Sequence, residues 1–246
     1  MLLRIYMDKI TSGIIDKLSI IGFFNVILSG GVLLYGISPI LDRYVPGIFY
    51  LQLGLEKDLE KGIVMCLLCF ILGCALQSVQ EFLFEGLSSH VKNRCLAIAE
   101  KTSDGTQAKG ILSNEYRREG LIKLADKLFS DKGLGEFDPN NKKMCSYFID
   151  YCDYSNSVKG FSSKSSRLSE SATFYEQIAV AFYALTVIGI LISIFSHTNV
   201  LLYCLGYLAM GSIFTGKAYQ CRLNWAKTVL STYEAVNDLV SSMHNK

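Results

Sequence analysis

Four long apolar runs constrain the fold of this chain more than any other feature. They cover Leu18–Leu41, Ile63–Phe84, Phe174–Phe195 and Val200–Gly216. Each approaches or exceeds the roughly 17–25 residues that an α-helix needs to cross a hydrocarbon layer about 30 Å thick. A mean hydropathy of +0.30 agrees with this pattern. The sequence therefore predicts an all-α, polytopic membrane protein with four transmembrane helices and a helical cytoplasmic domain between the second and third.

These runs divide the chain into five predicted segments. They are an N-terminal segment 1–17, a first hairpin 18–84 with spans 18–41 and 63–84 and an outer loop 42–62, a polar domain 85–173, a second hairpin 174–216, and a C-terminal helix 217–246. Within the polar domain, the apolar spacing extends the second span to about Glu100. A second helix starts after Ser113 and places Leu121, Leu124, Ala125 and Leu128 on one face.

Two further helices are expected in the polar domain. Asp138-Pro139 is a favourable N-cap and N1 pair for a helix over Asn140–Val158. The segment Gly160–Ser166 then reads as a flexible hinge, and a helix starting at Ser169 feeds into the third span.

Lysine and arginine positions set the expected orientation, because short cytoplasmic segments retain positive charge. The turn 196–199 has no basic residue, and in the loop 42–62 the acidic residues outnumber the basic ones. Both termini and residues 85–173 are therefore expected in the cytoplasm, beneath a plasma membrane. None of the eight cysteines lies in the outer loops, which predicts reduced thiols. The absence of an N-x-[ST] sequon is consistent with a bacterial inner membrane.

Polar residues inside the spans are the first candidate site. Such groups are costly in lipid and usually face protein or water. On the first three spans, the candidates for a pore or polar intramembrane face are Asn25, Ser29, Gln77, Gln80, Glu81, Glu176 and Gln177. Small and polar residues form one stripe on each of the first two spans, and the two stripes are expected to meet. The stripe on the first span is Gly22, Asn25, Ser29 and Gly36, and the stripe on the second is Gly62, Cys66, Cys69, Gly73, Gln77 and Gln80. Two interpretations of these stripes remain open. The stripes can act only as contacts between helices, or they can line a cavity whose carboxylates form a cation-favouring ring in an oligomer.

The polar domain carries a second candidate, a possible face for a ligand or partner. Tyr147, Tyr151 and Tyr154 share one face of the third helix, and Lys142 and Lys143 precede them. A buried aromatic seam would explain the same spacing. The net charge of this domain is too small to indicate binding to nucleic acid.

The C-terminal helix has heptad spacing. Apolar residues recur at Ala226, Val229, Tyr233, Val236, Val240 and Met243. This spacing predicts packing on another helix, either within the chain or in a neighbouring subunit. Trp225, at the start of this segment, is expected to be an interfacial anchor.

Signatures of catalysis and of cofactor binding are absent from the sequence. The pair Cys66 and Cys69 has redox spacing, but no charge lies nearby to lower a thiol pKa. The three histidines, at positions 90, 197 and 244, are scattered, and no phosphate-binding or nucleophile motif occurs. We therefore expect neither an enzyme, nor a cofactor, nor a metal site.

The hairpin Phe174–Gly216, with its flanking helices Arg167–Tyr175 and Lys217–Met243, resembles in architecture the small multi-pass membrane effectors of bacterial anti-phage defence systems. That resemblance implies an antiviral ion channel or pore that opens when a cytoplasmic signal arrives. We therefore expect a homo-oligomer in the lipid bilayer whose cytoplasmic domain responds to a protein or a small molecule. The alternative is a non-conducting membrane anchor that docks a cytoplasmic partner protein.

Overall fold

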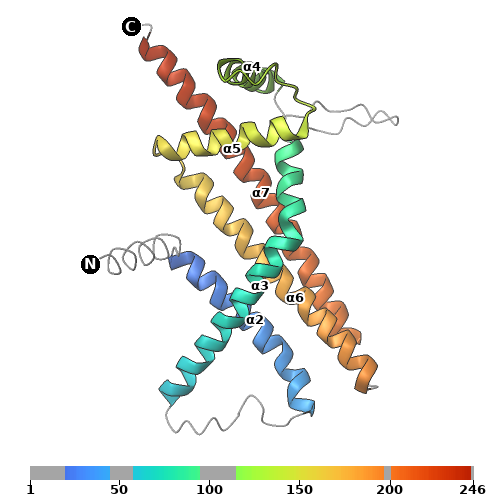
Figure 1. The fold of residues 1–246 in the computed structure, drawn as a ribbon. Helices are drawn as coiled ribbons and strands as arrows, with labels where there is room; N and C mark the ends of the chain where they lie inside the picture. Colours follow the sequence, from blue (N-terminus) through green and yellow to red (C-terminus); the bar gives the residue numbers. More distant parts are fainter. Residues whose placement is uncertain (1–19, 45–57, 95–114, 197–200, 245–246) are drawn as a thin grey trace, which may run out of the picture. The chain divides into compact units, whose positions relative to one another are not determined.

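The computed structural model describes residues 20–44, 58–94, 115–196 and 201–244, and six α-helices account for most of them (Figure 1). The helices are α2 (Ile20–Tyr44), α3 (Asp58–Arg94), α4 (Glu115–Asp131), α5 (Lys142–Val158), α6 (Ser163–Ser196) and α7 (Leu201–His244). These ranges contain no strand, so the all-α class is confirmed for them. The segments 1–17 and 95–100, residue Ser113, and most of the loop 42–62 lie outside the described residues.

Two of the four predicted spans are long and apolar enough to cross a bilayer in the described residues. They lie in α3, over Gly62–Lys92, and in α6, over Ser163–Ile194. In α2 the described apolar stretch is Gly22–Ser38. In α7 the apolar stretch that starts at Leu201 is interrupted by Lys217. The described residues therefore meet the length and hydropathy criterion at the second and third predicted spans, and the first and fourth spans stay predictions.

The chain divides into two compact units, and each is described separately. Unit 1 consists of Met1–Leu83 and Thr173–Ala218, and unit 2 consists of Phe84–Ala172 and Tyr219–Lys246. Three helices, α3, α6 and α7, contribute residues to both units without a break. The borders fall one or two residues from the predicted limits of the hairpins. That unit 1 lies in the bilayer and unit 2 in the cytoplasm stays a prediction.

In unit 1, α2 and α3 cross at two glycines. A Cβ atom at Gly30 would overlap the carbonyl oxygen of Cys69, and one at Gly73 would overlap the carbonyl oxygen of Val26. Only glycine permits this backbone approach, as is common between membrane helices. The sequence stripe anticipated Ser29 and Gly73 at this contact, and Ser29 is fully buried. Gly30, at the centre of the crossing, was missing from the predicted stripe.

The contact between α6 and α7 in unit 1 is largely aromatic. The rings of Phe182 and Phe214 stack with centroids 5.7 Å apart, and the hydroxyls of Tyr183 and Thr215 lie 2.9 Å apart. A separate hydrogen bond ties α7 to α2, because the hydroxyl of Tyr207 donates to the carbonyl oxygen of a glycine on α2 at 2.8 Å. These contacts join the helices of unit 1 by ring packing and by single hydrogen bonds.

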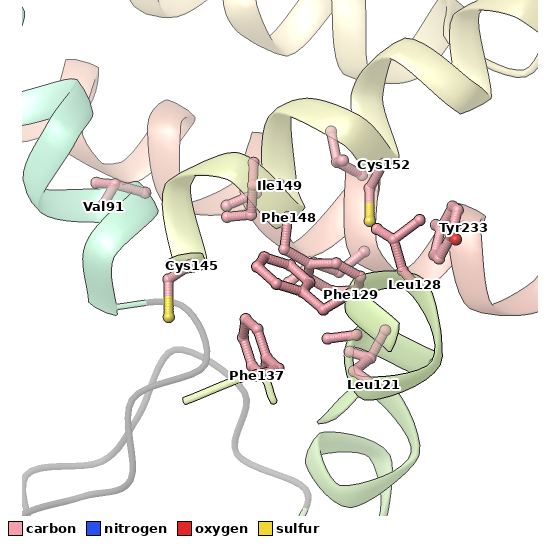
Figure 2. Close-up of a cluster of buried hydrophobic side chains, with 14 of the residues drawn as sticks. Val91, Leu121, Leu128, Phe129, Phe137, Cys145, Phe148, Ile149, Cys152 and Tyr233 are labelled. Atoms are coloured by element: carbon pink, nitrogen blue, oxygen red, sulfur yellow. The ribbon is translucent and has the colours of Figure 1, made fainter. Parts of the chain in front are cut away.

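Unit 2 has an apolar core drawn from α3, α4, α5, α7 and the α4–α5 connection (Figure 2). Phe148 is fully buried at its centre, and its ring lies 5.8 Å from that of Phe137 and 5.9 Å from that of Tyr233. The remaining buried members are Val91, Leu121, Ala125, Leu128, Phe129, Cys145, Ile149, Cys152, Trp225, Ala226, Val229 and Leu230. The predicted apolar face of α4 is thus confirmed at three of its four positions, since Leu124 is only partly buried.

The start of α5 differs from the expectation. Asn141, rather than Asp138, is the N-cap, and its side chain accepts hydrogen bonds from the backbone N–H groups of Lys143 and Met144. The carboxylate of Asp138 instead accepts from the N–H of Asn140 at 2.9 Å and stabilises the preceding turn. Both residues are good caps, and the later one is used because the chain is still turning at 138–140.

The connection between α5 and α6 is shorter than the hinge expected over Gly160–Ser166. Gly160 has φ of 78°, a left-handed conformation that ends α5, and α6 already begins at Ser163. The hydroxyl of Ser165 donates to the carbonyl oxygen of Ser162 at 2.9 Å and also to the carboxylate of Asp153 at 3.3 Å. Ser165, part of the segment expected to be a flexible hinge, therefore stabilises the first turn of α6. The helix begins at Ser163, so the expected start at Ser169 was wrong.

The heptad positions of α7 pack inside unit 2. Ala226, Val229, Tyr233 and Val236 are all buried, and the side chains of the two later heptad positions lie outside the described residues. For the described positions, the alternative of packing within the same chain is the one observed. Trp225 also belongs to this core, so its expected role as an interfacial anchor was wrong.

Candidate functional site in unit 1

Apolar side chains are exposed on every helix of unit 1. Phe24 on α2 is 56 % exposed, Ile194 on α6 is 63 % exposed, and Phe82 on α3 and Leu202 on α7 are each 81 % exposed. A soluble domain would bury most of an apolar helix, yet only 17 % of the apolar window of α3 is buried. Exposed apolar surface of this extent is typical of proteins that contact a membrane or another protein there.

Polar side chains show the opposite distribution in unit 1. The buried polar residues described there are Ser29, Gln80, Glu176, Gln177 and Thr186. Two of them satisfy their hydroxyls within their own helix, since Ser29 donates to the carbonyl oxygen of Val26 and Thr186 to that of Phe182, each at 2.9 Å. The carboxylate and the two amides cannot be satisfied in this way, and they form the candidate site.

The centre of the site is a hydrogen bond between α3 and α6. The side-chain amide of Gln80 donates through Nε2 to Oε2 of Glu176 at 2.7 Å. Glu176 is 0 % exposed and Gln80 is 5 % exposed. The low polarity around two such buried groups strengthens the hydrogen bond between them. The two residues are 96 positions apart in the sequence, so this pairing is a product of the fold.

Two buried oxygens at the site remain unsatisfied among the described residues. Gln80 uses its Nε2 on the carboxylate, but its Oε1 has no hydrogen-bond partner there. The Oε1 of Gln177, the residue after Glu176, also has no hydrogen-bond partner among the described residues, and this side chain is 2 % exposed. Buried polar atoms are nearly always paired, so these two amide oxygens are exceptions among the described residues of unit 1.

The other predicted residues of the intramembrane face lie apart from this pair. Gln77 and Asn25 are half-buried, and Glu81 is exposed. The structure thus brings together Gln80 and Glu176, with Gln177 adjacent in the chain. It does not bring Glu81 into the buried site, although Glu81 directly follows Gln80, because neighbouring residues in a helix point about 100° apart.

The predicted face on α5 of unit 2 is only partly exposed. Tyr154 is exposed, whereas Tyr151 is half-buried against the ring of Tyr233. The structure adds Lys132, which the sequence did not suggest. Its Nζ lies 4.5 Å from the ring centroid of Tyr151 and 3.3 Å from the hydroxyl oxygen of Tyr147.

A bound ligand at this face would therefore meet tyrosines already in contact with a cation. The two predicted lysines, Lys142 and Lys143, are exposed at the first turn of α5.

Burial changes the acid–base properties of three groups in unit 2. It raises the pKa of the Cys145 thiol to about 11 and that of the Tyr233 hydroxyl to about 12. It also raises the pKa of the Asp153 carboxyl, against the opposing effect of the hydrogen bond from Ser165. A thiol with such a pKa stays protonated at neutral pH and is a poor nucleophile. Cys145 is therefore a core residue in its chemistry as well as in its position.

Among the described residues, no three His, Cys, Asp or Glu side chains lie close enough to form a metal site of the usual kind. Seven cysteines are described, and no disulfide joins any two of them. Comparison of the chain with protein-family models, with curated proteins and with solved structures finds no match. The functional assignment therefore depends on the physical chemistry of the site.

Proposed function

We propose that this chain is an oligomeric integral membrane protein in which unit 1 spans the bilayer with four helices and unit 2, in the cytoplasm, controls the permeability of that bilayer to ions. The observation that carries the proposal is Glu176, a carboxylate with no exposed surface in a unit whose outer faces are apolar. An ionisable residue inside a membrane is costly and is usually retained for a function such as ion or proton transfer.

Two features of the fold support control by unit 2. First, α3, α6 and α7 each run from one unit into the other as an unbroken helix, so a tilt or rotation has a rigid element to follow. Second, Gln80 and Glu176 lie on two of these three helices. A relative movement of α3 and α6 would change their hydrogen bond directly. The resemblance to anti-phage effectors extends the proposal to a defence role for the protein, with a cytoplasmic protein or small molecule as the signal.

The second candidate function is a non-conducting membrane anchor for a cytoplasmic partner. One observation favours it: Glu176 is bonded within a single chain, whereas a carboxylate ring at a subunit boundary would leave this side chain exposed on the isolated chain. In an anchor, the Gln80–Glu176 bond only holds α3 and α6 together. Neither candidate involves an enzymatic reaction.

Ion flux in liposomes separates the two candidates. The purified full-length protein is reconstituted, its oligomeric state is measured by mass, and flux is compared with empty liposomes. The variants are Glu176→Gln and Gln80→Leu, with Ser212→Ala as the control, because the exposed Ser212 bonds only within α7. We expect flux from a defined oligomer and at least a tenfold change in both site variants, which is about 1.4 kcal/mol in a barrier. Liposomes that stay impermeable with intact oligomers would favour the anchor.

A further inference from the structure

We infer that α2 bends at Pro39, and that the hydroxyl of Tyr207 on α7 makes this bend possible by keeping a hydrogen bond on the carbonyl oxygen of Gly36. The contacts involved lie within unit 1, on α2, α6 and α7. The bend is a conformational device of the fold, and it goes beyond the proposed function because it does not require that the protein conducts.

Pro39 weakens the hydrogen-bond ladder of α2 near its C-terminal end. It lies inside the helix, which continues after it to Tyr44. Proline has no backbone N–H, so it gives no helical bond to the carbonyl oxygen of Tyr35, four residues earlier. Sharp bends in helices occur mostly at proline or at comparable breaks in the ladder. In membrane helices such residues are tolerated where neighbouring helices satisfy the freed backbone groups.

Tyr207 supplies a donor beside this weak point. Its hydroxyl donates to the carbonyl oxygen of Gly36 at 2.8 Å. In a regular helix this same oxygen accepts a bond from the N–H of Ile40, the residue after Pro39. A carbonyl oxygen has two lone pairs and can accept both bonds. When α2 bends and the bond from Ile40 opens, Gly36 therefore keeps its bond from Tyr207.

The surroundings of Gly36 make this second bond valuable. The side chain of Leu185 on α6 is 0 % exposed and packs so closely on Gly36 that an added Cβ atom would overlap it. A carbonyl oxygen left unpaired beside apolar side chains is costly. The hydroxyl of Tyr207 removes this cost from the bent conformation, so it favours bending relative to the straight helix.

The part of α2 before Pro39 is held in place. Gly30 packs on the backbone of α3, and Gly36 packs on α6. Tyr207 is held as well, because its ring lies 6.2 Å from that of Phe182 on α6. The movement is therefore confined to the last turn of α2, after Pro39.

Hydrogen exchange of the full-length protein in nanodiscs tests the bend. The backbone amides to follow are those of Ile40 and Leu41, directly after Pro39. In the Tyr207→Phe protein, bending leaves the carbonyl oxygen of Gly36 unpaired, so exchange at both amides should slow by about tenfold. Unchanged or faster exchange would overturn the inference, because the hydroxyl would then act only as a tie between α2 and α7.

Tyr203→Phe is the matched control. Tyr203 lies one turn before Tyr207 on α7, is 59 % exposed, and its hydroxyl has no hydrogen-bond partner among the described residues. Exchange in this variant should equal that of the unmodified protein. A tenfold slowing here as well would mean that the loss of any tyrosine hydroxyl has this effect, and the assignment to Gly36 would be wrong.

A second variant links the hydroxyl to the proline. Pro39→Ala restores a backbone N–H that can bond to the carbonyl oxygen of Tyr35, so this change alone should slow exchange at Ile40 and Leu41. Adding Tyr207→Phe should then slow exchange no further, because no bend remains for the hydroxyl to support. Equal slowing by Tyr207→Phe in both backgrounds would contradict the inference. Exchange does not depend on ion flux, so impermeable liposomes would remove the proposed conduction and leave this result intact.

Discussion

Replacing Gly73 by alanine should loosen the α2–α3 crossing of unit 1. The added Cβ would overlap the backbone carbonyl oxygen of Val26, and a backbone atom cannot move aside by changing rotamer. The two helices must separate by about 1 Å, and a gap of that size forfeits a quarter to a half of the dispersion energy of each contact that it opens. The buried side chains at the crossing include Val26, Ser29 and Cys69.

The expected cost follows from these terms. Overpacking of a tight core contact costs about 1–3 kcal/mol, and alanine returns up to about 1 kcal/mol through its higher helix propensity. We expect a net destabilisation of about 1 kcal/mol. For a chain of 246 residues this lowers the unfolding midpoint by roughly 2–4 °C. The midpoint is measured in detergent with a thiol-reactive dye, which labels the buried Cys69 and Cys204 of unit 1 when that unit unfolds.

Two further variants make the result decisive. Gly86 lies on the same helix with nothing within 4 Å of an added Cβ, so Gly86→Ala should leave the midpoint unchanged or raise it slightly. The double variant Gly30→Ala with Gly73→Ala should cost less than the sum of the single changes, because one separation of the helices accommodates both Cβ atoms. A Gly73→Ala protein as stable as the Gly86→Ala protein would refute the backbone contact.

Two predictions concern unit 2. Phe148→Ala removes the fully buried ring at the core and should lower the unfolding free energy of unit 2 by about 3–5 kcal/mol. Denaturant titration measures this through the fluorescence of Trp225, the chain's single tryptophan. Tyr154→Ala, at a 69 % exposed position, should change the unfolding free energy by less than about 0.5 kcal/mol. Burial raises the pKa of Tyr233 from 10.0 to about 12, so between these pH values the folded state binds more protons than the unfolded state and stability should fall as pH rises. Tyr233→Phe should flatten this alkaline fall, and an equally steep fall in the variant would contradict the buried hydroxyl.

Local patterns predicted much of the helical structure. The apolar spacing on α4 located Leu121, Ala125 and Leu128 correctly, because a helix must bury one face whatever it packs against. Capping chemistry was less specific. Asp138 and Asn141 are both good N-caps, and only the path of the turn decides between them. The serine-rich start of α6 was misjudged for the same reason, since serine serves equally in hinges and in first turns.

The site required long-range information. Composition identified Gln80 and Glu176 as costly polar residues, but it could not pair them, because partners 96 positions apart are selected by helix packing. Gly30 was missed because the stripe drawn from Gly22, Asn25, Ser29 and Gly36 weighted polar residues, whereas the crossing depends on backbone approach. Trp225 was misplaced because proximity to an apolar run suggests an interfacial anchor, although its own face of α7 packs in unit 2.

Labelling of introduced cysteines tests most directly whether unit 1 spans the bilayer with unit 2 in the cytoplasm. One cysteine replaces Asn199, between α6 and α7, and another replaces the exposed Ser130 of unit 2, with the unmodified chain as the baseline for native thiols. In intact spheroplasts, a membrane-impermeant maleimide should label position 199 but not position 130, which should react only after permeabilisation. Equal labelling of both positions in intact cells, or recovery of the chain in the soluble fraction, would contradict the account.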